Sequence, residues 1–336
     1  MSRIVHSLSC ISFGLALAVA GSFTISAGTA EAAEDWPGGS VTFVLPTGPG
    51  GSADQSLLPL KAPLEKELGT TLLYSYKKGA GGELGWSLVY NDGAKGTTIG
   101  GFWIPHMPNT VLFQKPPYKV DDFSPVAMLT GDVPVWFANK DSPYNDMNDL
   151  LADARKRPDQ VKLVIGVFTG EHYITVASVE QQAKVDFRVV SVQAGSKVTA
   201  NILGNHFDVG VIRPLSIYSV RDEVKCLGVV AAKRSPVFPN CKTFDEQLSK
   251  DVKVPHLSFS IGVLATTAFK KSNPEGFKKL VAAVKKAAAS KAYIDGMKRA
   301  GRVVTYAGPD EAAKMVKDTA KLMEQYKPMI KKAQGK

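Results

Sequence analysis

The feature that most restricts the fold is an alternation of short apolar runs with helix-like segments, which occurs twice along the chain. The expected strands are 41–45, 71–76, 97–103, 161–168, 187–192 and 207–212, and the expected helices are 57–68, 82–92, 150–158, 171–183 and 197–205. Such alternation is typical of parallel sheets covered by helices. Because the series appears twice, the sequence predicts two α/β units.

Two extended segments, 124–141 and 255–267, are longer than a typical strand and could pass between the two units. From Asn273 onward the pattern is almost entirely helical, with Pro274 and Pro309 at helix starts, where proline is tolerated. The predicted domains follow from these crossings. Domain 1 comprises residues 35–136 plus 258–336, and domain 2 comprises residues 137–257.

The first residues have the pattern of a secretory signal peptide, residues 1–32. Arg3 supplies a positive start, an apolar run covers 11–20, and Ala30-Glu31-Ala32 fits the small-residue cleavage rule. We therefore expect cleavage between Ala32 and Ala33 and a location in the periplasm. An uncleaved anchor stays open as the alternative, although the run is shorter than the ~18 residues that a spanning helix needs.

The composition, with 44% hydrophobic and 21% charged residues, indicates a folded soluble protein. The formal charge of +10 comes from dispersed lysines without interleaved aromatic residues, so it indicates a solvated basic surface that attracts small anions, not a nucleic-acid site. After cleavage two cysteines remain, Cys226 and Cys241, and export makes a disulfide plausible. Two free thiols are the alternative, and no metal-type spacing is present.

The loop PTGPGGSAD, residues 46–54, joins an expected strand to an expected helix. Gly48-x-Gly50-x-x-Ala53 matches a dinucleotide fingerprint, but the second strand ends in Tyr76-Lys77-Lys78 and lacks the acidic residue that would bind the ribose. No cofactor is therefore expected.

A simpler interpretation is an anion cradle, in which the N–H groups of Gly50 and Gly51 approach a ligand closely. Ser52 and Gln55 have capping-box spacing, which places the helix start near Ala53 and a partial positive charge at the loop. A tight turn that binds nothing is the alternative for this loop.

The second unit repeats the arrangement at Thr169-Gly170-Glu171-His172 and at Gln193-Ala194-Gly195-Ser196. Ligands of open α/β sheets bind outside the carboxyl ends of the strands, and clefts between lobes are common pockets. The chain has no phosphate loop with Gly-Lys-Ser/Thr, no nucleophile elbow and no histidine pair with metal spacing. We therefore expect a binding protein and not an enzyme.

Longer stretches resemble the extracytoplasmic solute-binding proteins of tripartite tricarboxylate transporters, the Bug or TctC family. The resemblance covers nearly all of the chain after the signal peptide and includes WPGGSVTFVLPTGPGGSAD (36–54), KKGAGGELG (77–85), PPYKVDDFSPVAML (116–129), GSKVTANILGNHFDVGV (195–211) and AAKRSPVFPN (231–240). It implies a two-lobe, type II-like periplasmic binding protein fold, each lobe a sheet covered by helices, with two crossing hinge strands. It also implies a monomer that binds a small carboxylate and delivers it to two membrane subunits.

The chain departs from the family pattern at its loops. Thr47, Gly48 and Pro49 stand where the family usually has an aromatic residue and proline before its glycines, and Ser52 and Ala53 replace Gly and Thr. In the second unit, the range 168–172 replaces a Gly-x-Gly-Thr-x-x-His pattern, which puts Glu171 beside the expected anion site, and Gln193-Ala194-Gly195-Ser196 replaces Tyr-Lys-Gly-Ser. Ile212-Arg213 stands where Asp-Asn is frequent.

The candidate ligand-binding residues all lie in these loops or end the strands before them. They are Thr47, Gly48, Gly50, Gly51, Ser52, Asp54, Trp103, Phe168, Thr169, Gly170, Glu171, His172, Gly195, Ser196 and Arg213. Arg213 suits bidentate binding of a carboxylate, or an ion pair with Glu171. Glu171 could favour the helix dipole, or recognise an ammonium or hydroxyl group.

Further alternatives concern the aromatic residues and the function. Trp103 and Phe168 line the cleft or belong to the core, and His172 and His206 are ordinary polar residues unless they meet the ligand. The expected function is a periplasmic receptor for a di-, tri- or aromatic carboxylate. The alternatives are a protein that presents its ligand to a membrane sensor kinase, a receptor for an amino acid or other amine, and an enzyme that uses Glu171 or His172.

Overall fold

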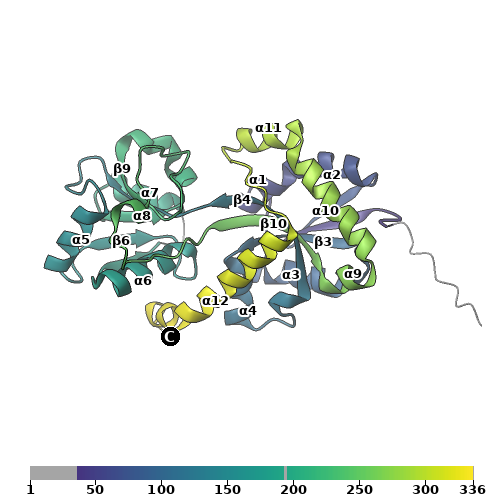
Figure 1. Ribbon diagram of the computed structural model, residues 1–336, viewed down its shortest axis with the longest axis horizontal. Helices are drawn as coiled ribbons and strands as arrows, with labels where there is room; N and C mark the ends of the chain where they lie inside the picture. Colours follow the sequence, from purple (N-terminus) through teal and green to yellow (C-terminus); the bar gives the residue numbers. More distant parts are fainter. Residues whose placement is uncertain (1–35, 193–194, 336) are drawn as a thin grey trace, which may run out of the picture. The chain divides into compact units, whose positions relative to one another are not determined.

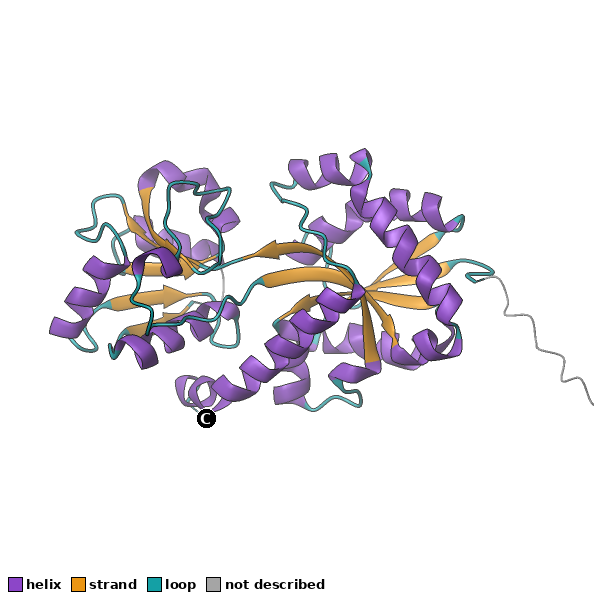
Figure 2. Cartoon of the chain, in the orientation of Figure 1, coloured by secondary structure: helices purple, strands orange, loops and turns teal. Residues whose placement is uncertain are grey.

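The computed structural model describes residues 36–192 and 195–335. The expected signal peptide and residues Gln193 and Ala194 lie outside the described residues. The chain forms two five-stranded mixed sheets with helices packed on them (Figures 1 and 2). This confirms the prediction of a two-lobe α/β fold. No helix in the described ranges is long and apolar enough to cross a membrane.

The first sheet has the strand order β2-β1-β3-β10-β4. Its strands are β1 (Val41–Leu45), β2 (Leu72–Tyr76), β3 (Thr98–Ile104), β4 (Phe123–Asp132) and β10 (Phe259–Thr266). β1 is parallel to β2 and β3, whereas β10 is antiparallel to β3 and β4. The first residues of β10 therefore lie at the same end of the sheet as the last residues of β1, β2 and β3.

The second sheet has the strand order β7-β6-β8-β5-β9. Its strands are β5 (Val135–Asn139), β6 (Lys162–Ile165), β7 (Arg188–Ser191), β8 (Val209–Ile212) and β9 (Val224–Val229). β6 is parallel to β7 and β8, and Val135 at the beginning of β5 pairs with Ile212 at the end of β8. β5 begins three residues after β4 ends. The carboxyl ends of the parallel strands of both sheets are thus next to this crossing.

Helices fill the connections between these strands. The α-helices are α1 (Ser52–Leu57), α2 (Lys61–Leu68), α3 (Glu83–Asp92), α4 (His106–Gln114), α5 (Met147–Lys156), α6 (Glu171–Ala183), α7 (Gly195–Leu203), α8 (Phe244–Gln247), α9 (Thr267–Ser272), α10 (Pro274–Ala289), α11 (Lys291–Arg299) and α12 (Pro309–Ala333). Short 3-10 helices are η1 (Leu58–Leu60), η2 (Ala80–Gly82), η3 (Gly93–Lys95), η4 (Val120–Asp122) and η5 (Pro214–Glu223). The sequence pattern did not predict α4 or β9.

The helix α12 contacts elements of both units. It packs on β4 and α4, and its later residues Met323, Tyr326 and Ile330 belong to the apolar core around the second sheet. Tyr326 also shares a hydrogen bond with Ser178 of α6 through their hydroxyl groups. The predicted domain boundaries at 136/137 and 257/258 stay a prediction.

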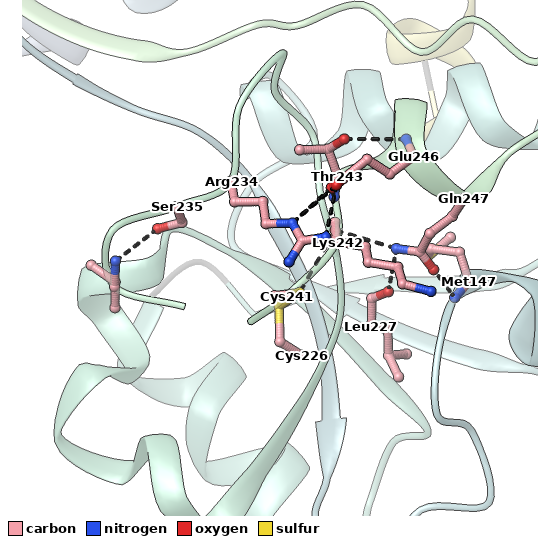
Figure 3. Close-up of a disulfide and its surroundings, with 11 residues drawn as sticks. Met147, Cys226, Leu227, Arg234, Ser235, Cys241, Lys242, Thr243, Glu246 and Gln247 are labelled. Atoms are coloured by element: carbon pink, nitrogen blue, oxygen red, sulfur yellow. Dashed lines mark hydrogen bonds and ion pairs between the residues drawn. A yellow bond between two sulfur atoms is a disulfide. The ribbon is translucent and has the colours of Figure 1, made fainter. Parts of the chain in front are cut away.

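Cys226 of β9 and Cys241 form a disulfide, with sulfur atoms 2.11 Å apart (Figure 3). The loop that it closes contains Arg234, which pairs with Glu246 at 2.7 Å. Glu246 in turn forms a capping box with Thr243 at the start of α8. The disulfide therefore joins the two ends of this loop, and the ion pair connects the middle of the loop to α8.

Candidate ligand-binding site

A cavity of about 430 Å³ opens at the carboxyl ends of strands β1, β2 and β3 of the first sheet. Its lining residues are Pro46, Thr47, Ser52, Ala53, Lys78, Gly79, Ala80, Gly81, Gly82, Trp103, His106, Arg213 and Phe259. All but Arg213 come from the first sheet and from the loops and helices that connect its strands. The volume suits a small organic molecule.

The loop after β1 is held by its own hydrogen bonds. The Gly50 N–H group donates to Asp54 Oδ2 at 2.7 Å, and the Gly51 N–H group donates to the Gly48 carbonyl at 3.3 Å. The other Asp54 oxygen accepts from the Tyr76 hydroxyl at 2.7 Å. The N–H groups of Gly50 and Gly51, which the sequence assigned to a ligand, thus form hydrogen bonds within the loop. Asp54 is buried, stabilises the loop and does not line the cavity.

The helix after this loop begins at Ser52, one residue earlier than expected, with Gly51 in the N-cap position and no side-chain cap. The expected capping box does not form, because Ser52 lies inside the helix. Its hydroxyl accepts a hydrogen bond from Arg302 Nη2 at 2.8 Å, and the Gln55 amide donates to the Gly50 carbonyl at 3.2 Å. Ser52 and Ala53, in the first turn, reach the cavity.

The loop after β2 supplies a second set of backbone donors. Gly79, Ala80, Gly81 and Gly82 have φ values of 153°, 46°, 69° and 111°, a run that glycine adopts far more easily than other residues. The Gly82 N–H group donates to the Gly79 carbonyl at 2.9 Å. The Gly79 and Gly81 N–H groups donate to no other described residue, and successive free N–H groups in such loops bind anions.

Lys78 precedes these glycines and is exposed. No ion pair joins its ammonium group to another residue in the described ranges. From the sequence, this loop is recognised only by its resemblance to the family pattern. Three glycines and a lysine between a strand and a helix were the signal that could have placed it in the site.

Aromatic side chains form the wall of the cavity at β3 and β10. The Trp103 ring lies 6.4 Å from the His106 ring, and His106 lies 5.5 Å from the Phe259 ring. Nδ1 of His106 is buried without a hydrogen-bond partner among the described residues. Burial lowers the pKa of His106 to about 4, so this imidazole is neutral at pH 7.

Arg213 follows β8 and is fixed on two sides. Its Nε atom donates to Glu171 Oε1 at 2.7 Å, and its guanidinium carbon lies 3.7 Å from the centre of the Phe259 ring. The ion pair that the sequence left open is therefore present. Arg213 still lines the cavity, and its two Nη groups donate to no other described residue.

Glu171 opens α6 and is 0% exposed. Burial alone would raise the pKa of Glu171, but Arg213 and the neighbouring histidines hold it below its ordinary range. Its Oε1 atom also lies 3.3 Å from Nε2 of His172, a ring whose pKa burial lowers to about 4. Neither residue lines the cavity. The second carboxylate oxygen of Glu171 is buried without a hydrogen-bond partner among the described residues, and recognition of an amine by Glu171 stays an alternative prediction.

The family model of the tripartite tricarboxylate transporter family receptor, TctC, matches residues 59–334. The chain belongs to this family. Protein BugT of Bordetella pertussis is 24% identical over 310 residues, which cover 90% of this chain and 93% of BugT. In the described part of this receptor no group of three or more His, Cys, Asp or Glu could hold a metal ion.

Two solved structures have the same fold as this receptor. A TctC solute-binding protein from Polaromonas, without ligand, has a TM-score of 0.77 at 21% identity and covers 86% of this chain and 98% of its own. MatC from Rhodopseudomonas palustris, with bound malate, has a TM-score of 0.65 at 23% identity. The match covers 86% of this chain and 99% of the MatC chain.

The remaining predicted residues of the receptor, Gly48 among them, do not line the cavity. Phe168 packs against Tyr173, with ring centres 5.1 Å apart, and the Thr169 carbonyl accepts a hydrogen bond from Asn109 of α4. Gly170 is the N-cap of α6, Gly195 lies against Ile212, and Ser196 is exposed at the start of α7. The structure thus brings together Thr47, Ser52, Trp103 and Arg213 of the predicted set. Sequence reasoning missed Lys78, the Gly79–Gly82 loop, His106 and Phe259.

Proposed function

We propose that this receptor captures a small carboxylate in the cavity at the carboxyl ends of strands β1, β2 and β3. The observation that carries the proposal is that Lys78 and the loop of Gly79 and Gly81, whose N–H groups have no partner among the described residues, line one cavity. Charge-assisted hydrogen bonds from such groups are the strong ones for carboxylates. The bound malate of the related MatC supports the same ligand class.

The direct test is a thermal-shift screen of residues 33–336, stripped of co-purified ligand by dialysis in denaturant and refolded. Mono-, di- and tricarboxylates, aromatic acids, amino acids and neutral sugars would be compared at equal concentration. A ligand present at 100 times its Kd adds about 2.7 kcal/mol to the free energy of unfolding and raises the Tm. A rise with carboxylates alone supports the proposal. A rise only with sugars or amines would overturn it.

The delivery step is part of the proposal. The chain acts in the periplasm after cleavage of residues 1–32, works as a monomer without catalysis, and hands its ligand to the two membrane subunits of the transporter. N-terminal sequencing of the protein from a periplasmic extract should begin at Ala33. A mature protein that still carries residues 1–32 would contradict the export step. The split at residues 136/137 and 257/258 is proposed as the domain division that accompanies binding.

A further inference from the structure

We propose that the cavity selects a carboxylate with one negative charge and an apolar body over a ligand with two or three carboxylates. This inference rests on the proposed function, because it concerns the ligand of the same cavity. Three observations carry the inference. They are the order of the strands that bear the lining residues, the ion pair of Arg213 with Glu171, and the aromatic wall.

The strand order gives the cavity two different ends. β2 lies at one edge of the first sheet, followed by β1, β3 and β10. Lys78 and the Gly79–Gly82 loop follow β2, so the free N–H groups and the ammonium group lie at that end. Trp103 ends β3 and Phe259 begins β10, so the aromatic rings lie toward the other end. A carboxylate and an apolar group of one ligand would fit these two ends in that order.

Among the residues that line the cavity, the charge at the aromatic end is offset; Arg302 and Asp132, outside the lining, act on each other's pKa, and Arg213 acts on the pKa of both. Arg213 is the cation there, and it is bonded to the fully buried carboxylate of Glu171. Burial keeps the pKa of His106 low, so its imidazole is neutral at pH 7. Lys78 is thus the cationic side chain of the lining that has no ion pair within the described part of the chain. The lining offers one uncompensated positive charge, which matches one carboxylate.

A second carboxylate would meet an unfavourable environment at the aromatic end. It would give up water beside Trp103 and Phe259, and it would approach a guanidinium whose charge Glu171 already offsets. The guanidinium carbon of Arg213 lies 3.7 Å from the centre of the Phe259 ring, so the residue that Glu171 fixes also packs on this part of the wall. We therefore expect at least about a tenfold preference for the single carboxylate, the effect of ~1.4 kcal/mol.

Isothermal titration calorimetry with two matched pairs tests this preference on the ligand-free receptor. Hexanoate and adipate differ in one carboxylate on the same chain, and benzoate and terephthalate differ in the same way on a ring. The expected result is that the monocarboxylate binds at least about tenfold tighter in each pair that binds. Equal or tighter binding of adipate or terephthalate overturns the inference and leaves the proposed function standing.

The same titration separates the two proposals. If none of the four probes binds while malate or citrate does, the inference fails and the proposed function survives. If no carboxylate binds, both fail. Lys78→Met should weaken hexanoate or benzoate at least about tenfold, and the neighbouring exposed Lys77→Met, outside the lining, should leave the Kd unchanged. Equal effects of both variants would overturn the assignment of the anion end.

A charge-restoring variant sharpens the result. Glu171→Gln keeps the shape of the side chain but releases the charge of Arg213 toward the cavity. The ratio of adipate to hexanoate affinity should then rise several-fold relative to the unmodified receptor, provided that the circular dichroism spectrum shows a folded protein. An unchanged ratio in a folded variant contradicts the charge argument. If the variant does not fold, the wild-type comparison of the matched pairs still decides the inference.

Discussion

The strand ends of the two sheets carry similar loops and use them differently. At the first sheet, the loops after β1 and β2 border an open cavity, and the Gly79 and Gly81 N–H groups have no partner in the described residues. At the second sheet, the loop after β6 leads into Glu171 and His172, which the chain buries against Arg213 and each other. In our proposal the first region binds the ligand, whereas in the second region Glu171 is paired with Arg213 and lies outside the cavity lining.

This difference shows that an anion cradle is decided by the side chains that reach it, not by the glycines alone. Gly170 precedes α6 as Gly51 precedes α1. At α6, however, Glu171 supplies the negative charge that a ligand would otherwise bring, and Arg213 balances it. The second sheet therefore contributes to the cavity through one positioned guanidinium.

The largest expected effect comes from breaking the buried pair. The carboxylate of Glu171 is 0% exposed, and Arg213→Met removes its ion-pair partner. Because an unpaired buried charge is unfavourable, the variant should lower the free energy of unfolding by about 3–5 kcal/mol. Urea denaturation measures this. The double variant Arg213→Met with Glu171→Gln should recover most of the loss. A loss below ~1 kcal/mol in the single variant would mean that the second region is not self-paired in solution.

The next effect is a loss of stability in mild acid. The pKa of His172 and that of His106 are lowered by burial to about 4 from an ordinary 6.5, so the unfolded chain binds protons more readily. The folded state should keep its full stability above pH 6.5 and lose about 1–3 kcal/mol per imidazole between pH 6.5 and 4. His172→Gln should flatten the profile, and the exposed His206→Gln should not. Identical profiles for the two variants would contradict the assignment.

A smaller effect is expected from the loop after β2. Gly82→Ala forces a side chain onto a residue with φ of 111° and places a Cβ atom 2.7 Å from Trp86, so it should cost about 1–3 kcal/mol and weaken carboxylate binding. Gly50→Ala has a φ of 76° but open space around the new atom, so it should cost about 1 kcal/mol. Urea denaturation and calorimetry would rank the two. If Gly50→Ala weakened carboxylate binding more than Gly82→Ala, the result would place the anion at the loop after β1.

The smallest effect concerns the anchor of the β1 loop. Asp54→Asn can keep one of the hydrogen bonds from Gly50 and Tyr76, so it should cost about 1 kcal/mol of stability. Carboxylate affinity should change less than about threefold, ~0.6 kcal/mol, because Asp54 does not line the cavity. Tyr76→Phe, which removes one of the same hydrogen bonds, is the matched control. A tenfold change in the Kd would place Asp54 in the site after all.

Much of the fold could be predicted from the sequence, because apolar runs and helical spacing are local signals. The helix α6 was predicted with its bounds, and the two α/β units and the family resemblance were predicted correctly. The pattern did not reveal α4, whose sequence HMPNTVLFQ contains Pro108 and lacks a long apolar stripe. That miss removed His106 from the predicted site.

The site was predicted only in part, because its geometry depends on contacts between distant residues. The sequence could not show that Asp54 takes the Gly50 N–H group, or that Arg302 takes the Ser52 hydroxyl across 250 positions. It left the Glu171–Arg213 pair as one of two alternatives for the same reason. The extended segment 255–267 was predicted to pass between the units, but its antiparallel pairing with β3, which brings Phe259 beside Trp103 and His106, depends on contacts between distant residues.

The most direct test of the contrast between the two regions is amide chemical-shift mapping of the labelled receptor during titration with the carboxylate that gives the largest thermal shift. We expect the largest changes at Gly79 and Gly81, with smaller ones at Ser52 and Ala53. The amides of Gly170 and Gly195 should change little. The largest changes at Gly170 and Gly195 would contradict the account and place the anion at the second sheet.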